Sequence, residues 1–185
     1  MATNAATCHA GTFMSRVSMD FHLADSSVTE ALGQALARAL PGGAMPLGAV
    51  VYLQGDLGAG KTTCVRSLLR TLGVTGPVRS PTYTLVETYD LAALTCVHVD
   101  LYRVQALAEV DELGLRDLVG AHCLLLVEWS DKGVGVLPPA DLNLVLSYAA
   151  DARRAHLSAD TPLGRVWLEN LGSDTRLAPY VPNLT

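Results

Sequence analysis

The chain has 185 residues, of which half are hydrophobic and 17% are charged, and its formal net charge is −5. This composition excludes a disordered chain, and the length is sufficient for one domain with a buried core. The negative charge argues against a protein that grips nucleic acid by itself, because that affinity comes from Lys and Arg side chains that neutralise phosphates. No apolar run reaches the ~18 residues of a membrane span, and the four cysteines form no C-x-x-C pair, so we expect reduced thiols and a cytoplasmic location.

The chain is expected to begin with a flexible N-terminal extension over residues 1–16, which are mainly small and polar. A single domain over 17–171 and a C-terminal tail over 172–185 are expected to follow. The first predicted elements are a strand over 18–23 and a helix that starts at Ser27-Val28-Thr29-Glu30, which has the form of a capping box.

A strand, a glycine-rich loop and a helix come next. Ala49 to Gln54 is a short apolar run typical of a strand, and Gly55 to Thr63 reads GDLGAGKTT, which fits the phosphate-binding pattern G-x-x-x-x-G-K-[ST]. In such a loop consecutive backbone N–H groups point at phosphate oxygens, a lysine reaches the β- and γ-phosphates, and a hydroxyl ligates Mg²⁺. We therefore expect a Mg²⁺–nucleotide site with contacts from Asp56, Leu57, Gly58, Ala59, Gly60, Lys61, Thr62 and Thr63.

A loop over 76–83 follows this helix and precedes a strand predicted over 84–89. It contains Ser80-Pro81-Thr82, whose hydroxyls have two interpretations. They could sense the γ-phosphate or its metal ion, as the switch loops of nucleotide-binding proteins do, or they could belong to an ordinary turn. The residues alone leave both open.

Two further strands, over 95–100 and 122–128, end in the carboxylates Asp100 and Glu128. Ligands of open α/β sheets sit beyond the carboxyl ends of strands, so both acids can meet the phosphate-binding loop there. Lys61, Asp100 and Glu128 are the candidate catalytic residues, and Thr62, Asp100 and Glu128 are the candidate metal ligands. The alternative for each acid is a helix or turn cap. His98 is interpreted as a packed or hydrogen-bonded strand residue and not as a catalytic one.

The remaining pattern fixes the expected fold class. A helix is predicted over 104–118, interrupted near Gly114, and an antiparallel hairpin over 141–148 and 153–159 is followed by a helix that starts at Thr161-Pro162. We expect an α/β fold, a P-loop NTPase-like three-layer sandwich whose central sheet is mostly parallel and carries a C-terminal antiparallel hairpin. The guanine-reading element N-K-x-D is absent from the sequence, which favours ATP.

Several blocks together make the chain similar to the bacterial TsaE family, the ATPases of tRNA threonylcarbamoyladenosine biosynthesis. The blocks are Thr29 with Leu32-Gly33, the loop Gly55–Thr63, Ser80–Glu87, His98 with Asp100-Leu101-Tyr102-Arg103, and Glu128-Trp129. Two departures from the family pattern are Val99, where Phe is frequent, and Ser130, where Pro is frequent.

The resemblance implies an ATP-hydrolysing accessory of the TsaB–TsaD pair, which modifies adenosine 37 of tRNAs that read codons beginning with A. It implies that tRNA is reached through that complex, and no contact with DNA or a membrane is expected. Thr62 would bind Mg²⁺, Asp100 and Glu128 would lie at the metal and hydrolysis site, and the segment containing Ser26 and Thr29 would lie near the adenine.

Three alternatives remain open on the sequence. A small-molecule kinase on a similar fold would need an arginine-rich lid, for which Arg103 and the pair Arg153-Arg154 are the candidates. A nucleotide-binding scaffold without turnover is another. A zinc site from Cys96, His98, His122 and Cys123 is a third, although this spacing matches no usual zinc pattern.

Overall fold

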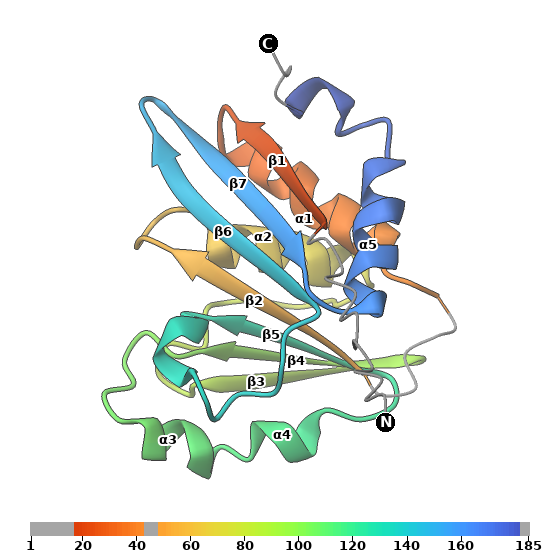
Figure 1. The fold of residues 1–185 in the computed structure, drawn as a ribbon. Coiled ribbons are helices and arrows are strands. Elements are labelled where there is room, and N and C mark those ends of the chain that lie inside the picture. The colour runs from red at the N-terminus through yellow and green to blue at the C-terminus, as the bar shows by residue number, and fades with distance from the viewer. Residues whose placement is uncertain (1–16, 43–47, 182–185) are drawn as a thin grey trace, which may run out of the picture.

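The computed structural model of the chain describes residues 17–42 and 48–181, in which one seven-stranded sheet is flanked by helices (Figure 1). The strands are β1 (Val17–Leu23), β2 (Ala49–Gly55), β3 (Val86–Leu91), β4 (Leu94–Asp100), β5 (Cys123–Glu128), β6 (Leu142–Ala149) and β7 (Ala152–Ala159). The helices are α1 (Ser26–Ala39), α2 (Lys61–Thr71), α3 (Leu107–Glu112), α4 (Leu115–Leu118) and α5 (Pro162–Gly172), with 3₁₀ turns η1 (Ser130–Gly133) and η2 (Ala178–Tyr180). No helix in these ranges combines the length and apolar character needed to cross a membrane.

The strand order is β1-β7-β6-β2-β5-β4-β3, with β2 in the middle. Strand β2 runs parallel to both β5 and β6, and β4 runs parallel to β5. The other three neighbouring pairs, β1–β7, β6–β7 and β3–β4, are antiparallel. The sheet is therefore mixed, and the expectation of a mostly parallel sheet is wrong. Two-residue turns join β3 to β4 and β6 to β7, and so short a connection can join only antiparallel strands. The predicted C-terminal hairpin, β6–β7, is confirmed.

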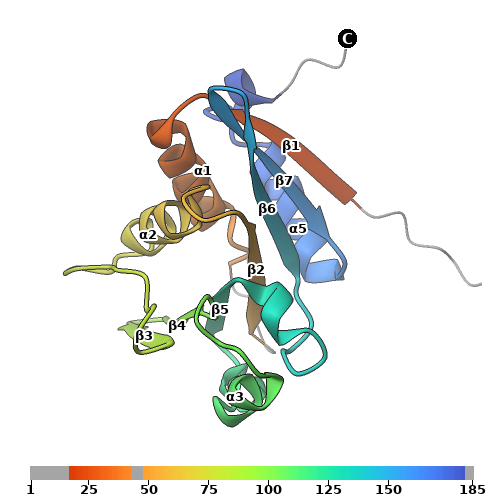
Figure 2. The same ribbon diagram turned by 90° about the vertical axis from the view of Figure 1, so that its left-hand side faces the viewer.

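Helices cover both faces of the sheet. Figure 2 shows α1 and α2 on one side of β3, β4 and β5, with α3 on the other. The core on the α1–α2 face also includes α5, whose Trp167 is buried and donates from Nε1 to the Leu36 carbonyl at 2.9 Å. A second, smaller core lies under α3 and α4 and contains Val97, Leu125 and Val127. Strand β5 is buried along its whole length because it has cover on both faces.

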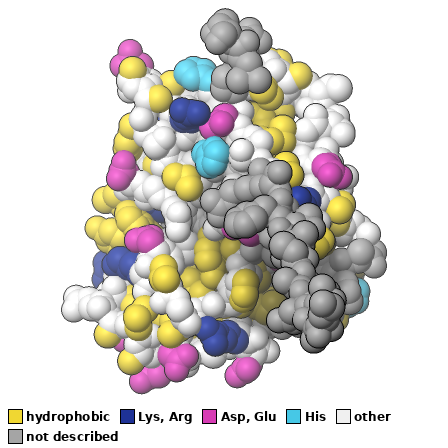
Figure 3. Space-filling model, in the orientation of Figure 1, with side chains coloured by type: hydrophobic (Ala, Val, Ile, Leu, Met, Phe, Trp, Pro, Cys, Tyr) yellow, Lys and Arg dark blue, Asp and Glu magenta, His cyan; other side chains and the backbone are white. Residues whose placement is uncertain are grey.

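The outer part of the sheet leaves one face polar. Strands β1 and β7 place Phe21 and Leu157 in the main core, while the alternate positions point to the other side, as a period of two requires. Asp20 on that side accepts from Arg154 Nε and pairs with His156 Nδ1, both at 3.1 Å. Figure 3 shows histidines and side chains of both charges on the upper part of this face.

Several element boundaries differ from the sequence prediction. Helix α1 is capped by Asp25, whose Oδ1 accepts from the N–H groups of Ser27 and Val28, so the predicted capping box at Ser27 is wrong. In the helical segment predicted over 104–118, the predicted interruption near Gly114 is confirmed, because this residue, with a φ of 59°, separates α3 from α4. Helix α3 begins later than predicted, at Leu107.

The predicted division into an extension, a domain and a tail stays a prediction. Residues 1–16 lie outside the described residues. Beyond residue 171, Leu177 is buried in the main core, and Asp174 accepts from Arg38 of α1 at 2.7 Å.

Candidate nucleotide site

The phosphate-binding loop connects β2 to α2, in the setting that the sequence predicts. Its glycines Gly55, Gly58 and Gly60 have φ values of 125°, 77° and 110°, a region that favours glycine. A Cβ at Gly55 would lie 1.9 Å from the Leu146 carbonyl oxygen of β6. The loop is thus pressed against the neighbouring strand, and its backbone conformation requires glycine at these positions.

Lys61 is the first residue of α2 and its side chain folds back over the loop. Its Nζ donates to the carbonyl oxygens of Gly55 at 2.6 Å and Asp56 at 2.9 Å, and it lies 3.9 Å from the ring centroid of Trp129. Burial lowers the pKa of Lys61, although the nearby carboxylates, Glu128 first, act in the opposite direction. The ammonium group therefore sits among acceptors that phosphate oxygens can replace.

Asp100 and Glu128 lie side by side at the carboxyl ends of β4 and β5, where they are register partners. Both are buried, with exposed fractions of 3% and 2%. The hydroxyl of Thr62 donates to Glu128 Oε2 at 2.9 Å, which links the carboxylate to the phosphate-binding loop. The structure thus brings Thr62, Asp100 and Glu128 together, as the strand-end argument predicted.

The loop Ser80–Thr82 contacts the carboxylate of Asp100. Ser80 Oγ makes a short hydrogen bond to Asp100 Oδ2, Thr82 Oγ1 lies 3.4 Å from the same oxygen, and the two hydroxyls are 2.8 Å apart. The backbone N–H of Tyr102 donates to Asp100 Oδ1 at 2.9 Å. This geometry favours the switch interpretation over the ordinary turn, because the loop hydroxyls contact a candidate metal ligand directly.

These residues enclose a cleft of about 300 Å³ lined by Leu57, Gly58, Gly60, Lys61, Thr62, Thr63, Ser80, Thr82, Asp100, Tyr102, Glu128 and Trp129. The donor set fits a nucleotide with Mg²⁺. Carboxylate and hydroxyl oxygens are the ligands that Mg²⁺ takes, and a glycine loop with a lysine suits phosphates.

The zinc alternative has no support in the described part of the chain, where no group of three or more His, Cys, Asp and Glu residues could hold a metal ion. Cys96 belongs to the main core and Cys123 to the core on the opposite face of the sheet. The two thiols therefore cannot converge on one ion.

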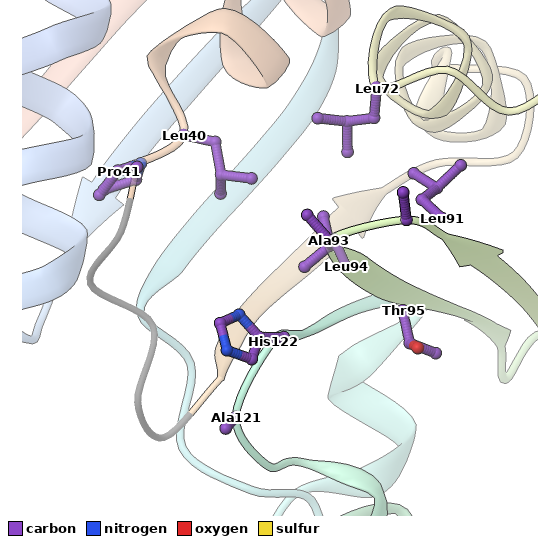
Figure 4. A pocket seen from close by; sticks show the side chains of 11 residues that line it. Leu40, Pro41, Leu72, Leu91, Ala93, Leu94, Thr95, Ala121 and His122 are labelled. Carbon is purple, nitrogen blue, oxygen red and sulfur yellow. The ribbon is translucent and has the colours of Figure 1, made fainter.

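A larger hollow, of about 860 Å³, lies at the other end of the strands, beside the turn that joins β3 to β4 (Figure 4). Its lining is mostly apolar and includes Leu40, Leu72, Leu91 and Leu94, with His122 at one end. Among the described residues that line it there is no carboxylate and no part of the phosphate-binding loop, so its size does not make it the candidate site.

Comparison with known proteins identifies the family of the chain. The family model described as "Threonylcarbamoyl adenosine biosynthesis protein TsaE" matches residues 23–156. The chain belongs to the TsaE family. It is 48% identical over 116 residues to the tRNA threonylcarbamoyladenosine biosynthesis protein TsaE of Haemophilus influenzae, covering 63% of this chain and 73% of that one. To the TsaE of Bacillus subtilis it is 38% identical over 107 residues, covering 58% and 66%. The crystal structure of Bacillus subtilis YdiB is similar, with a TM-score of 0.67, 27% identity and coverage of 85% and 96%.

The resemblance implies that the segment containing Ser26 and Thr29 lies near the adenine, and the structure puts Thr29 of this segment beside the phosphate-binding loop. Thr29 of α1 is buried, and its Cγ2 lies 3.1 Å from where a Cβ of Gly60 would be. Ser26 is exposed in the first turn of α1. The departures Val99 and Ser130 are both buried and leave Glu128 in the cleft.

Sequence reasoning missed several contacts of this TsaE-family site. Trp129 packs on Lys61, Tyr148 Oη donates to the Leu57 carbonyl at 3.0 Å, and His98 contacts Glu128 at 2.9 Å. Two of the three had a usable signal in the sequence. Trp129 directly follows Glu128, and His98 lies two residues before Asp100 in a strand, so the His98 and Asp100 side chains point to the same face.

Proposed function

We propose that the chain binds ATP with Mg²⁺ and hydrolyses it in the cytoplasm as the accessory ATPase of the TsaB–TsaD pair. In this role it supports threonylcarbamoyl modification of adenosine 37 in tRNAs that read codons beginning with A, and it reaches tRNA through that pair. Membership of the TsaE family supports the pathway, and the cleft supports the chemistry.

The observation that carries the proposal is the contact between Thr62 Oγ1 and Glu128 Oε2, with Asp100 beside Glu128 in register. This arrangement puts a hydroxyl and two carboxylates at the mouth of a phosphate-binding loop. A P-loop NTPase needs such a set, an oxygen ligand from the loop and an acidic residue from a neighbouring strand. We also propose that the fold is of the P-loop NTPase-like type.

Each group of residues in the cleft has a separate role in this proposal. Backbone N–H groups of the loop hold the phosphates, and Lys61 exchanges the carbonyls of Gly55 and Asp56 for phosphate oxygens. Thr62, Asp100 and Glu128 would hold Mg²⁺, which when bound neutralises charge that develops on the phosphates. Glu128 is also the group placed to orient an attacking water molecule.

The loop Ser80–Thr82 would carry the state of the nucleotide to the surface. Its hydroxyls contact Asp100 at the base of the cleft, and the next residue, Tyr83, is 83% exposed and lies under the Arg103 guanidinium at 4.0 Å. A change at the γ-phosphate could therefore alter the position of the exposed Tyr83 side chain through Asp100 and the loop hydroxyls. We propose that ATP occupancy orders this loop and changes the affinity for the partner pair.

The first test is Mg²⁺-dependent ATP hydrolysis by the purified chain, alone and with TsaB and TsaD. We expect weak activity alone, a change on adding the partners, and a loss of about 10²-fold or more in kcat for Lys61→Ala and Glu128→Gln. Glu169→Gln is the matched control, because this acid is exposed on α5 and lies outside the cleft. Unchanged hydrolysis in both cleft variants would refute the assignment of the site.

The second test is reconstitution of tRNA modification with hydrolysable and non-hydrolysable ATP. We expect modified tRNA to require hydrolysis. Transfer of the labelled γ-phosphate to a small molecule instead of water would establish the kinase alternative. Tight ATP binding with normal modification in Glu128→Gln would establish the scaffold without turnover.

A further inference from the structure

His98 is a fully buried histidine that touches the site from beneath, and neither the family match nor the proposed function gives it a role. Its exposed fraction is 0%, and its Nε2 lies 2.9 Å from Glu128 Oε1. Its other nitrogen, Nδ1, is buried without a hydrogen-bond partner among the described residues. A buried polar atom without a partner is costly, so a purely structural position here would favour an apolar residue.

The two oxygens of the Glu128 carboxylate have different partners. Glu128 Oε2 accepts from the Thr62 hydroxyl at 2.9 Å, while Oε1 faces His98 at the same distance. The ring nitrogen of His98 can donate to this oxygen only in the form that carries a hydrogen on Nε2, and that form is the one in which His98 would hold the carboxylate.

We propose that His98 is a positioning residue for the hydrolysis reaction. Its Nε2–H occupies Oε1 of Glu128 and fixes the rotation of the carboxylate, so that Oε2 faces Thr62 and the cleft. This inference rests on the proposed ATP hydrolysis. Strand geometry makes the arrangement possible, because His98 and Asp100 share a face of β4, and Glu128 lies across from Asp100 on β5. His98 touches neither the loop nor the substrate, and it acts through Glu128.

The test compares His98→Leu, which removes the donor and keeps an apolar side chain, with His98→Gln, whose amide nitrogen reaches a position close to that of Nε2. We expect His98→Leu to lower kcat about tenfold or more with KM for ATP unchanged, and His98→Gln to restore most of kcat. In a Glu128→Gln background, His98→Leu should cause no further loss, because the residue that it positions is already disabled. An unchanged kcat in His98→Leu, equal losses in both variants, or an additional loss in the Glu128→Gln background would overturn the proposal.

Two readouts do not depend on activity. Nitrogen-15 NMR of the labelled wild-type chain should show a protonated, hydrogen-bonded Nε2 and an unprotonated Nδ1 in His98, and the hydrogen on Nδ1 would overturn the proposal. A crystal structure of His98→Leu should show Glu128 Oε2 moved away from Thr62, and an unmoved carboxylate would argue against the positioning role. If the wild-type chain does not hydrolyse ATP, the proposed function fails, and these two measurements still decide whether His98 holds Glu128.

Discussion

Gly33 in helix α1 faces the helix that follows the phosphate-binding loop. A Cβ at Gly33 would lie 2.3 Å from the Cys64 carbonyl oxygen and 3.0 Å from Ser67 Cβ, both in α2. A hydrogen bond also joins the two helices here, because Ser67 Oγ of α2 donates to the Glu30 carbonyl of α1 at 2.8 Å. The helices pack at this point because position 33 has no side chain, so Gly33→Ala forces them apart.

The size of the effect follows from two opposed terms. Alanine is favoured over glycine inside a helix by about 1 kcal/mol. Overpacking costs about 1–3 kcal/mol, and the upper end applies here because the clashing atom is a backbone carbonyl and not a flexible side-chain end. We therefore expect Gly33→Ala to lower the free energy of unfolding by about 2 kcal/mol, which for a chain of this length corresponds to a Tm lower by roughly 4–8 °C.

Thermal and urea unfolding of the wild type and Gly33→Ala measure this loss. Gly120→Ala is the matched control, since a Cβ there meets nothing within 4 Å and the backbone is not in the left-handed region, so a gain of about 0.4–1 kcal/mol is expected. Because α2 begins at Lys61, Gly33→Ala should also weaken ATP binding. A Tm for Gly33→Ala equal to or above that of the wild type would refute the account of α1–α2 packing.

Three other outcomes test separate parts of the molecule. Burial alone would raise the pKa of Asp174, but the hydrogen bonds and positive charges of Arg38 and Arg176 together hold this pKa below its ordinary value. The Arg38–Asp174 pair therefore stabilises the fold above about pH 3.9, and it loses that contribution as the pH falls through the lowered pKa. The stability difference between wild type and Asp174→Asn should therefore shrink in acid, and a constant difference from pH 6 to pH 2.5 would contradict this. Burial raises the pKa of Cys64 to about 12, so in native chain at pH 8 mass spectrometry should find this thiol unalkylated by iodoacetamide, and rapid labelling would contradict its burial. Ser80→Ala removes a hydrogen bond to Asp100 and should lower kcat about tenfold, measured beside the exposed Thr84→Ala as control, with an unchanged kcat arguing against the switch role.

Local chemistry explains which predictions succeeded. The loop Gly55–Thr63 has a required residue type at nearly every position, so its strand–loop–helix setting is readable from the sequence and is confirmed. The strands ending at Asp100 and Glu128 are also confirmed, because apolar runs ending in a carboxylate mark strand ends clearly. Parallel pairing was overestimated, since hydrophobic pattern says little about strand direction.

The cap of α1 shows the limit of a local motif. Ser27-Val28-Thr29-Glu30 satisfies the capping-box pattern, yet Asp25 two residues earlier supplies the oxygen that accepts from the helix N–H groups. Aspartate and serine are both good N-caps, so residue type alone cannot decide between neighbouring candidates. The backbone decides it, because Asp25 is extended, with a φ of −153°, and the helix already begins at Ser26.

The sequence by itself determined the parts of the site that lie in one segment, namely the phosphate-binding loop, its lysine and its hydroxyl. Only the tertiary structure decided how groups far apart in the chain meet there. Parallel pairing of β4 with β5 puts Asp100 level with Glu128. The packing of α2 on the sheet brings Thr62 to one oxygen of Glu128, and His98 lies 2.9 Å from the other. A hydrogen bond is made between atoms about 3 Å apart, and the separation of residues along the sequence carries no record of that distance.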